Sequence, residues 1–120
     1  MKEICSGSLV VQKSRFYVHL YDIRSEAGIE DILKDHRRMY KRAVHHCWAC
    51  RLEASGGFVE RCKDDGEVGR PGKVLLEVMR RRDAAGLLVV SRIFGGVKLG
   101  VGGVSRAFRD AAERTLDRHT

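Results

Sequence analysis

The segment from Leu87 to Arg118 joins an apolar run, a glycine-rich loop and an amphipathic stretch without a break. The run LLVVSRIF at 87–94 is almost continuously apolar, which is typical of a central strand covered on both faces. From Val104 onward, apolar residues recur at helical spacing with charged residues between them. The chain must therefore turn from a buried strand into a helix within the glycine-rich loop, and this limits the folds it can adopt.

The glycine-rich loop needs a geometric reason, because each glycine costs backbone entropy on folding. Unusual dihedral angles in a tight turn are one reason, and close approach of the backbone to a ligand is another. Glycines before a helix present unpaired N–H groups and the positive end of the helix dipole, which suits an anion. The nucleotide signatures GxxxxGK[ST] and GxGxxG are not met, so a tight turn and a phosphate site both stay open. The candidate phosphate-binding residues are Gly95, Gly96, Gly100, Gly102 and Gly103, with Lys98 among them and Arg92 and Arg106 at the flanks.

Hydrophobic periodicity predicts two strands, a helix, two strands and a helix before this segment. The predicted elements are strands at 8–11 and 16–21, a helix from a Ser25 cap to Tyr40, strands at 43–52 and 58–62, a helix beginning at Pro71, the strand at 87–94 and the helix from 104. The order ββαββαβα predicts an α+β fold in two layers, because helices that follow strands must cover a face of the sheet.

Composition narrows the class of protein. At 120 residues we expect one domain, residues 1–120, that folds without disulfide bonds. The net charge of +7 favours anionic partners such as nucleic acid. The first residues lack the apolar region of a secretory signal, and no run approaches the ~20 apolar residues that cross a bilayer. We therefore expect a cytoplasmic protein with reduced cysteines and no membrane partner.

Two clusters suggest metal chemistry, and each has a plainer interpretation. Carboxylates at Asp64, Asp65 and Glu67 are of the type that holds Mg²⁺, but acidic residues before a glycine also favour turns. A zinc site would draw on His45, Cys47, Cys50 and Cys62. Along a strand, however, Cys47 and Cys50 point to opposite faces, so buried cysteines that act as small apolar residues are favoured. No cofactor is predicted.

Three motifs together resemble the N-terminal domain of the IMPACT/YigZ family. They are A-x-H-x-C-x-A-x-R at 43–51, DDGE at 64–67 and FGGVKLGVGGVSRAF at 94–108. The resemblance runs from Lys13 to Leu116 and implies the two-layer α+β fold of the ribosomal protein S5 domain 2 type. It also implies this domain standing alone, without the RWD or ferredoxin-like domains of longer members. The chain departs from the family pattern with Val68 and Val74 where prolines are common and with Cys50 in place of an aromatic residue.

The resemblance implies a role in translation, since eukaryotic members compete for a ribosome-associated activator of the starvation-responsive initiation-factor kinase. Our leading hypothesis is a non-enzymatic, translation-associated protein that binds RNA or a ribonucleoprotein surface through the glycine-rich loop and its basic neighbours, with Arg51 included in the basic set. One alternative is a binder of small phosphate compounds or a Mg²⁺-dependent enzyme that uses the acidic cluster. Another is a domain that contacts a translation factor.

Overall fold

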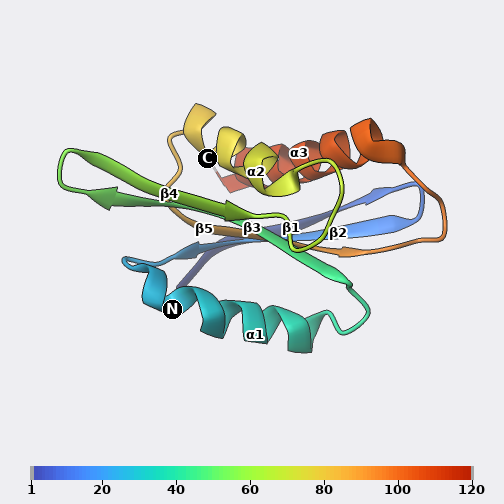
Figure 1. Cartoon of the computed structure of the whole chain (residues 1–120), viewed down its shortest axis with the longest axis horizontal. Coiled ribbons are helices and arrows are strands. Elements are labelled where there is room, and N and C mark those ends of the chain that lie inside the picture. Colours follow the sequence, from blue (N-terminus) through green and yellow to red (C-terminus); the bar gives the residue numbers. More distant parts are fainter. Residues whose placement is uncertain (1, 120) are drawn as a thin grey trace.

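The computed structural model describes residues 2–119, and the described chain forms one antiparallel sheet with helices packed on it (Figure 1). The elements are β1 (Lys2–Val11), β2 (Ser14–Asp22), the short 3-10 helix η1 (Glu26–Gly28), α1 (Ile29–Met39), β3 (His45–Ala54), β4 (Gly57–Lys63), α2 (Pro71–Arg81), β5 (Gly86–Ile93) and α3 (Gly100–His119). The five strands lie in the order β1-β2-β5-β3-β4. The α+β class and the order ββαββαβα are thus confirmed.

Helices cover both faces of this sheet. Figure 1 shows α2 and α3 on one face and α1 on the other. On β5, Leu88 and Val90 belong to the core under α2 and α3, whereas Leu87 and Val89 belong to the core under α1. This alternation explains why the run at 87–94 is apolar at successive positions, as predicted for a strand covered on both faces.

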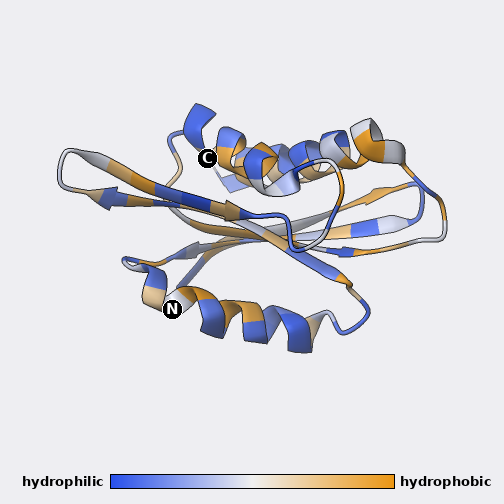
Figure 2. Ribbon diagram, in the orientation of Figure 1, coloured by the Kyte–Doolittle hydropathy of each residue, from blue (hydrophilic) through white to orange (hydrophobic). Residues whose placement is uncertain are grey.

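The helix α1 forms a third layer outside the pair made by the sheet and the α2–α3 layer. Its apolar stripe of Ile29, Ile32 and Leu33 faces the sheet, and its charged residues face away (Figure 2). The partners on the sheet include Trp48 and Leu87. These apolar side chains would otherwise face water, which is why α1 packs on this side.

Element boundaries differ from the sequence prediction at three places. The strand β1 begins at Lys2 rather than at residue 8, because it pairs with β2 along its length as an edge strand without an apolar pattern in its first half. The helix α3 begins at Gly100, so glycines that favour a loop form its first turn. Ser25 makes no side-chain capping bond, and η1 precedes α1 instead. The turn between β1 and β2 lies at Gln12 and Lys13, and both residues have positive φ.

No helix within residues 2–119 is both long enough and apolar enough to span a membrane.

Candidate functional site

The glycine-rich loop joins the end of β5 to α3. At three of its positions, close packing or the backbone conformation explains why the residue is glycine. A Cβ atom on Gly95 would lie 2.1 Å from the carbonyl carbon and oxygen of Lys13, so the loop packs directly against the β1–β2 turn. Gly96 and Gly100 have φ values of +88° and +74°, a region that L side chains rarely adopt. Gly102 and Gly103 lie in the first turn of α3 with ordinary backbone angles. The tight-turn interpretation therefore accounts for part of the loop.

Arg92 was predicted to bind phosphate, but its guanidinium contacts other residues of the protein. Its guanidinium forms an ion pair with Glu67 at 3.1 Å and donates to the Ser14 hydroxyl at 3.3 Å. Both charged side chains are almost fully enclosed, at 8% and 5% exposure. The same Ser14 oxygen accepts the N–H of Gly95 at 3.2 Å. Arg92 thus links the glycine-rich loop and the β1–β2 turn to the segment 64–67, which we call the acidic turn.

Arg51 lies at the other end of the sheet from Arg92. It is opposite Gly86 at the start of β5, whereas Arg92 is opposite His45, so six residues, or about 20 Å, separate the two arginines along the strands. Arg51 forms ion pairs with Glu60 at 3.3 Å and Asp83 at 3.0 Å. The structure does not bring Arg51 into the predicted phosphate site.

Lys98 and Arg106 stay available to a partner. Both are exposed, and neither side chain makes a hydrogen bond or ion pair with any residue in the part of the chain that the structure describes. The first turn of α3, which lies between them, contains no acidic residue. Of the four basic residues predicted to bind phosphate, only these two are exposed and without an ion pair among the described residues, as the hypothesis requires.

An apolar groove lies beside these basic groups, and the sequence analysis did not anticipate it. We call it the loop groove; it has a volume of about 320 Å³. Its walls are Val68, Arg92, Phe94, Lys98, Leu99, Gly100, Val101 and Val104. Phe94 and Val101 are unusually open for apolar residues, at 52% and 62% exposure, and Val68 is similarly exposed. The sequence did contain one sign of this groove: apolar residues occur in glycine-rich segments without the periodicity of a helix or a strand.

The acidic turn performs three separate structural tasks. An Asp64 carboxylate oxygen accepts the N–H of Gly72 at 2.9 Å, which satisfies a free donor in the first turn of α2. Asp65 accepts the backbone N–H of His46 at 2.8 Å. Glu67 accepts the N–H of Val68 and holds Arg92. The carboxylates therefore face different partners, although the acidic turn and the glycine loop are neighbours through the Glu67–Arg92 pair.

The candidate metal ligands do not converge. Within residues 2–119, no three histidine, cysteine, aspartate or glutamate side chains are arranged to hold a metal ion. Cys47 and Cys50 point into opposite cores, as the strand alternation predicts, and Cys62 is exposed. Burial raises the pKa of the Cys47 thiol, with Glu67 and Asp65 adding to the shift. His45 contacts the carbonyl oxygen of Asp65 through Nδ1 at 2.8 Å.

A chain of buried hydrogen bonds crosses the interface between α1 and the sheet. Tyr21 Oη lies 2.7 Å from His36 Nε2, and His36 Nδ1 lies 2.8 Å from Ser91 Oγ. Ser91 Oγ also lies 2.7 Å from His46 Nδ1. We call these four residues the α1-face chain. Sequence reasoning missed it, since His36 counted only as a position on an apolar helix stripe; a serine within the apolar run at 87–94 was the one available signal.

Burial keeps both histidines of the α1-face chain neutral. Desolvation, with the neighbouring His19 and His46, lowers the pKa of His36 to about 3. Desolvation also lowers the pKa of His46. The Ser91 hydroxyl has one hydrogen and can donate it to only one imidazole, so at least one of the two rings must donate its own Nδ1–H to Ser91. If one of the two rings accepts the Ser91 hydrogen, the other is the Nδ1–H tautomer.

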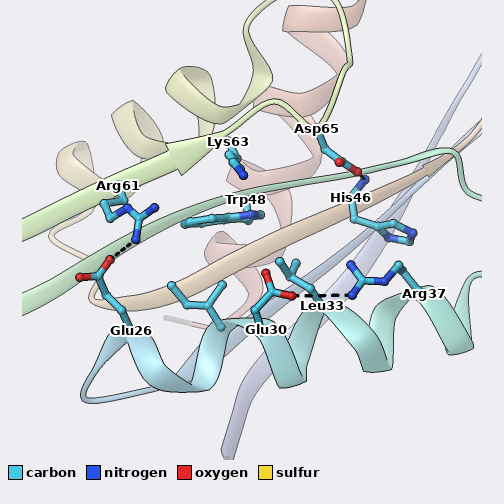
Figure 3. A pocket seen from close by; sticks show the side chains of 10 residues that line it. Glu26, Glu30, Leu33, Arg37, His46, Trp48, Arg61, Lys63 and Asp65 are labelled. Carbon is cyan, nitrogen blue, oxygen red and sulfur yellow. Dashed lines mark hydrogen bonds and ion pairs between the residues drawn. The ribbon is translucent and has the colours of Figure 1, made fainter.

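A second hollow, which we call the α1 pocket, lies between α1 and the β3–β4 edge (Figure 3). It has a volume of about 230 Å³. Its lining residues are Glu26, Ile29, Glu30, Leu33, Arg37, His46, Trp48, Arg61, Lys63 and Asp65. The α1-face chain ends at this pocket, because His46 belongs to both.

Comparison with known proteins gives one consistent result. The family model of the Impact N-terminal domain matches residues 12–116. The chain is similar to the IMPACT family member YvyE of Bacillus subtilis, with 32% identity over 119 residues that cover 98% of this chain and 54% of YvyE.

Two solved structures share the fold. One, described as a crystal structure of a hypothetical protein, has a TM-score of 0.86 and 26% identity and covers 95% of this chain and 57% of its own. The other, the two-domain translational regulator Yih1, has a TM-score of 0.61 and 21% identity and covers 98% of this chain and 46% of its own. The chain thus spans about half the length of these proteins. With the family model matching most of its residues, the chain belongs to the family of the Impact N-terminal domain.

Proposed function

We propose that this chain is a cytoplasmic, translation-associated binding domain that docks a protein segment in the loop groove. The observation that carries the proposal is the open apolar surface of Phe94 and Val101 beside a lysine without a partner among the described residues. Exposed apolar surface around a concave site is a mark of interaction surfaces. The partner segment would place one large apolar side chain in the groove.

The charges around the groove select an acidic flank on that segment. Lys98 lies on the wall of the groove, and Arg106 follows in α3. The first-turn N–H groups of α3 add partial positive charge that no acidic side chain of that turn offsets. Burying a large apolar side chain contributes about 2 kcal/mol, and rim charges add specificity more than affinity. We therefore expect weak to moderate binding of an apolar, acidic segment.

Family membership and fold support the setting in translation. The chain belongs to the Impact N-terminal domain family, and its fold occurs in a protein described as a two-domain translational regulator.

Peptide binding tests the proposal directly. The probe is a fluorescent peptide with a Leu-Phe core flanked by aspartates, and the control peptide carries lysines in place of the aspartates. By anisotropy, the acidic peptide should bind, Phe94→Ala should weaken it about tenfold, and Lys98→Ala should reduce its salt dependence. Phe58→Ala, at an exposed phenylalanine of β4, is the matched control and should bind normally. Equal binding of both peptides, or no effect of Phe94→Ala, would refute the proposal.

A second candidate is single-stranded RNA, which the same basic residues favour. Lys98 and Arg106 are open, the net charge is +7, and the exposed Phe94 ring is a surface on which a base can stack. RNA binding should fall steeply with salt, and Lys98→Ala and Arg106→Ala should each lower the slope by about one. Binding of an RNA oligonucleotide with these slopes, together with no binding of the acidic peptide, would favour this candidate.

A further inference from the structure

The α1 pocket contains a polar group held in a fixed orientation. His46 is 6% exposed, and its Nδ1 is bound to Ser91 at 2.7 Å. Asp65 accepts its backbone N–H at 2.8 Å, which fixes the main chain at this point. The remaining ring nitrogen, Nε2, has no partner among residues 2–119, and the ring lines the pocket (Figure 3).

The orientation of His46 is set by residues that never reach the pocket. Ser91 and His36 are fully buried, and the α1-face chain ends at Tyr21. Burying such polar groups is costly unless each is hydrogen-bonded, and an apolar interface of the same shape would avoid that cost. Fixing a ring by supporting hydrogen bonds is the arrangement found behind binding residues. The α1-face chain therefore serves to position His46 Nε2.

The charged residues of the pocket are mostly paired with one another. Arg61 is bound to Glu26 at 2.5 Å, and Arg37 lies 3.8 Å from Glu30. Lys63 makes no hydrogen bond or ion pair through its side chain within the described residues. It lies directly opposite Trp48 in the β3–β4 register, and both side chains line the pocket (Figure 3). Asp65, whose carboxylate accepts the His46 backbone N–H, is the one acidic residue of the lining outside these ion pairs. The polar groups without a partner within residues 2–119 are thus a cation and an imidazole, placed beside an aromatic ring.

We propose that the α1 pocket binds a small planar anion, with its charged group held by Lys63 and His46 Nε2–H and its flat part against Trp48. A volume of about 230 Å³ limits the ligand to roughly one ring with its anionic group. Charge-assisted hydrogen bonds from the lysine and the imidazole select a carboxylate or a phosphate. Anion binding selects the Nε2–H tautomer of His46 and therefore the Nδ1–H tautomer of His36. This site is separate from the loop groove and does not depend on the proposed function.

Tryptophan fluorescence gives a specific assay, because Trp48 is the single tryptophan of the chain. The probes are nicotinate for a carboxylate and phenyl phosphate for a phosphate, with nicotinamide and phenol as their uncharged counterparts. We expect one charged probe to bind at least tenfold more tightly than its uncharged counterpart, as measured by the change in Trp48 emission. Which charged probe binds decides between carboxylate and phosphate. Equal affinity for a charged probe and its uncharged counterpart, or no binding by either charged probe, overturns the proposal.

Two variants locate the site. Lys63→Met should weaken the bound probe about tenfold, whereas Lys34→Met, at an exposed lysine of α1 outside the pocket, should not. Both lysines are on the surface, so neither change threatens the fold. In nitrogen-15 spectra of the wild-type chain, the His46 Nε2 resonance should shift when the probe is added. In the bound state it should have the chemical shift of a protonated ring nitrogen. An unchanged Nε2 resonance, or equal weakening by both variants, contradicts the assignment.

Discussion

The two faces of the sheet differ in kind, although the same strands supply both. Under α2 and α3, Phe16 meets Phe108 edge to face at 5.1 Å within an apolar core. Under α1, the alternate residues of the same strands include Tyr21, Ser91 and His46, joined by hydrogen bonds. One face therefore obtains stability from apolar packing, and the other combines packing with oriented polar groups. The difference suggests that the apolar core under α2 and α3 maintains the fold, whereas the interior of the α1 face can also orient groups toward a small ligand.

The largest effect is expected on the apolar face. Phe108→Ala removes a fully buried ring and leaves a cavity against Phe16, which should lower the free energy of unfolding by about 3–5 kcal/mol. Urea denaturation measures this loss. Phe94→Ala, which removes an exposed ring in the loop groove, should stay within about 0.5 kcal/mol of wild type. A comparable loss in both variants would remove the distinction between core and groove.

Breaking the α1-face chain should cost less. Ser91→Ala leaves one nitrogen of His36 and one of His46 buried without a partner, and we expect a loss of about 2–3 kcal/mol in denaturant. The double variant His36→Leu/Ser91→Ala should lose less than the sum of its parts, because each change removes a partner of the other. Strict additivity would show that the hydrogen bonds do not act as a chain.

The pH dependence should come from the α1 face. The pKa of His36 is lowered to about 3 in the folded chain, against 6.5 for an ordinary histidine. The unfolded chain therefore binds more protons between these values, so stability is complete above pH 6.5 and falls as the pH is lowered toward 3. From about pH 7.5 to 5 the loss should be about 2 kcal/mol. Denaturation of His36→Leu across the same range should show a flatter profile, and an equally steep one would contradict the assignment.

The smallest effect is expected at the start of α2. Asp64→Ala removes the carboxylate that accepts the N–H of Gly72, and loss of such a cap typically costs about 1 kcal/mol. Asp64→Asn keeps an acceptor oxygen and should recover most of the stability. The midpoint of thermal unfolding distinguishes the two. If both variants lose the same amount, the charge of Asp64 rather than its hydrogen bond supports the helix.

Local pattern predicted those parts of the molecule that neighbouring residues determine. The apolar run at 87–94 predicted a strand covered on both faces, and the period of two in Phe16–Tyr21 predicted another strand. Their pairing is known only from the structure. The first half of β1 was missed because an edge strand with exposed residues carries no such pattern. The start of α3 was missed because glycine disfavours helix, and yet Gly100, Gly102 and Gly103 all lie in its first turn.

The site was less predictable because it depends on pairs distant in sequence. Arg92 is a basic residue at the end of a strand, and contacts with Glu67, twenty-five residues away, and with the still more distant Ser14 make it an internal link. His36 and Ser91 are separated by fifty-five residues, so no spacing rule connects them. Lys98 and Arg106 are exposed, and within residues 2–119 neither side chain makes a hydrogen bond or ion pair.

The place of β5 also bears on how the chain acquires its structure. The hairpins β1–β2 and β3–β4 form from neighbouring residues, but they touch in the sheet only through β5, which is the last strand to be synthesised. Long-range pairing of this kind is slow to form. In a nascent chain that ends before Gly86 the two hairpins have no strand to join them, so we expect cooperative folding only after residues 86–93 have emerged.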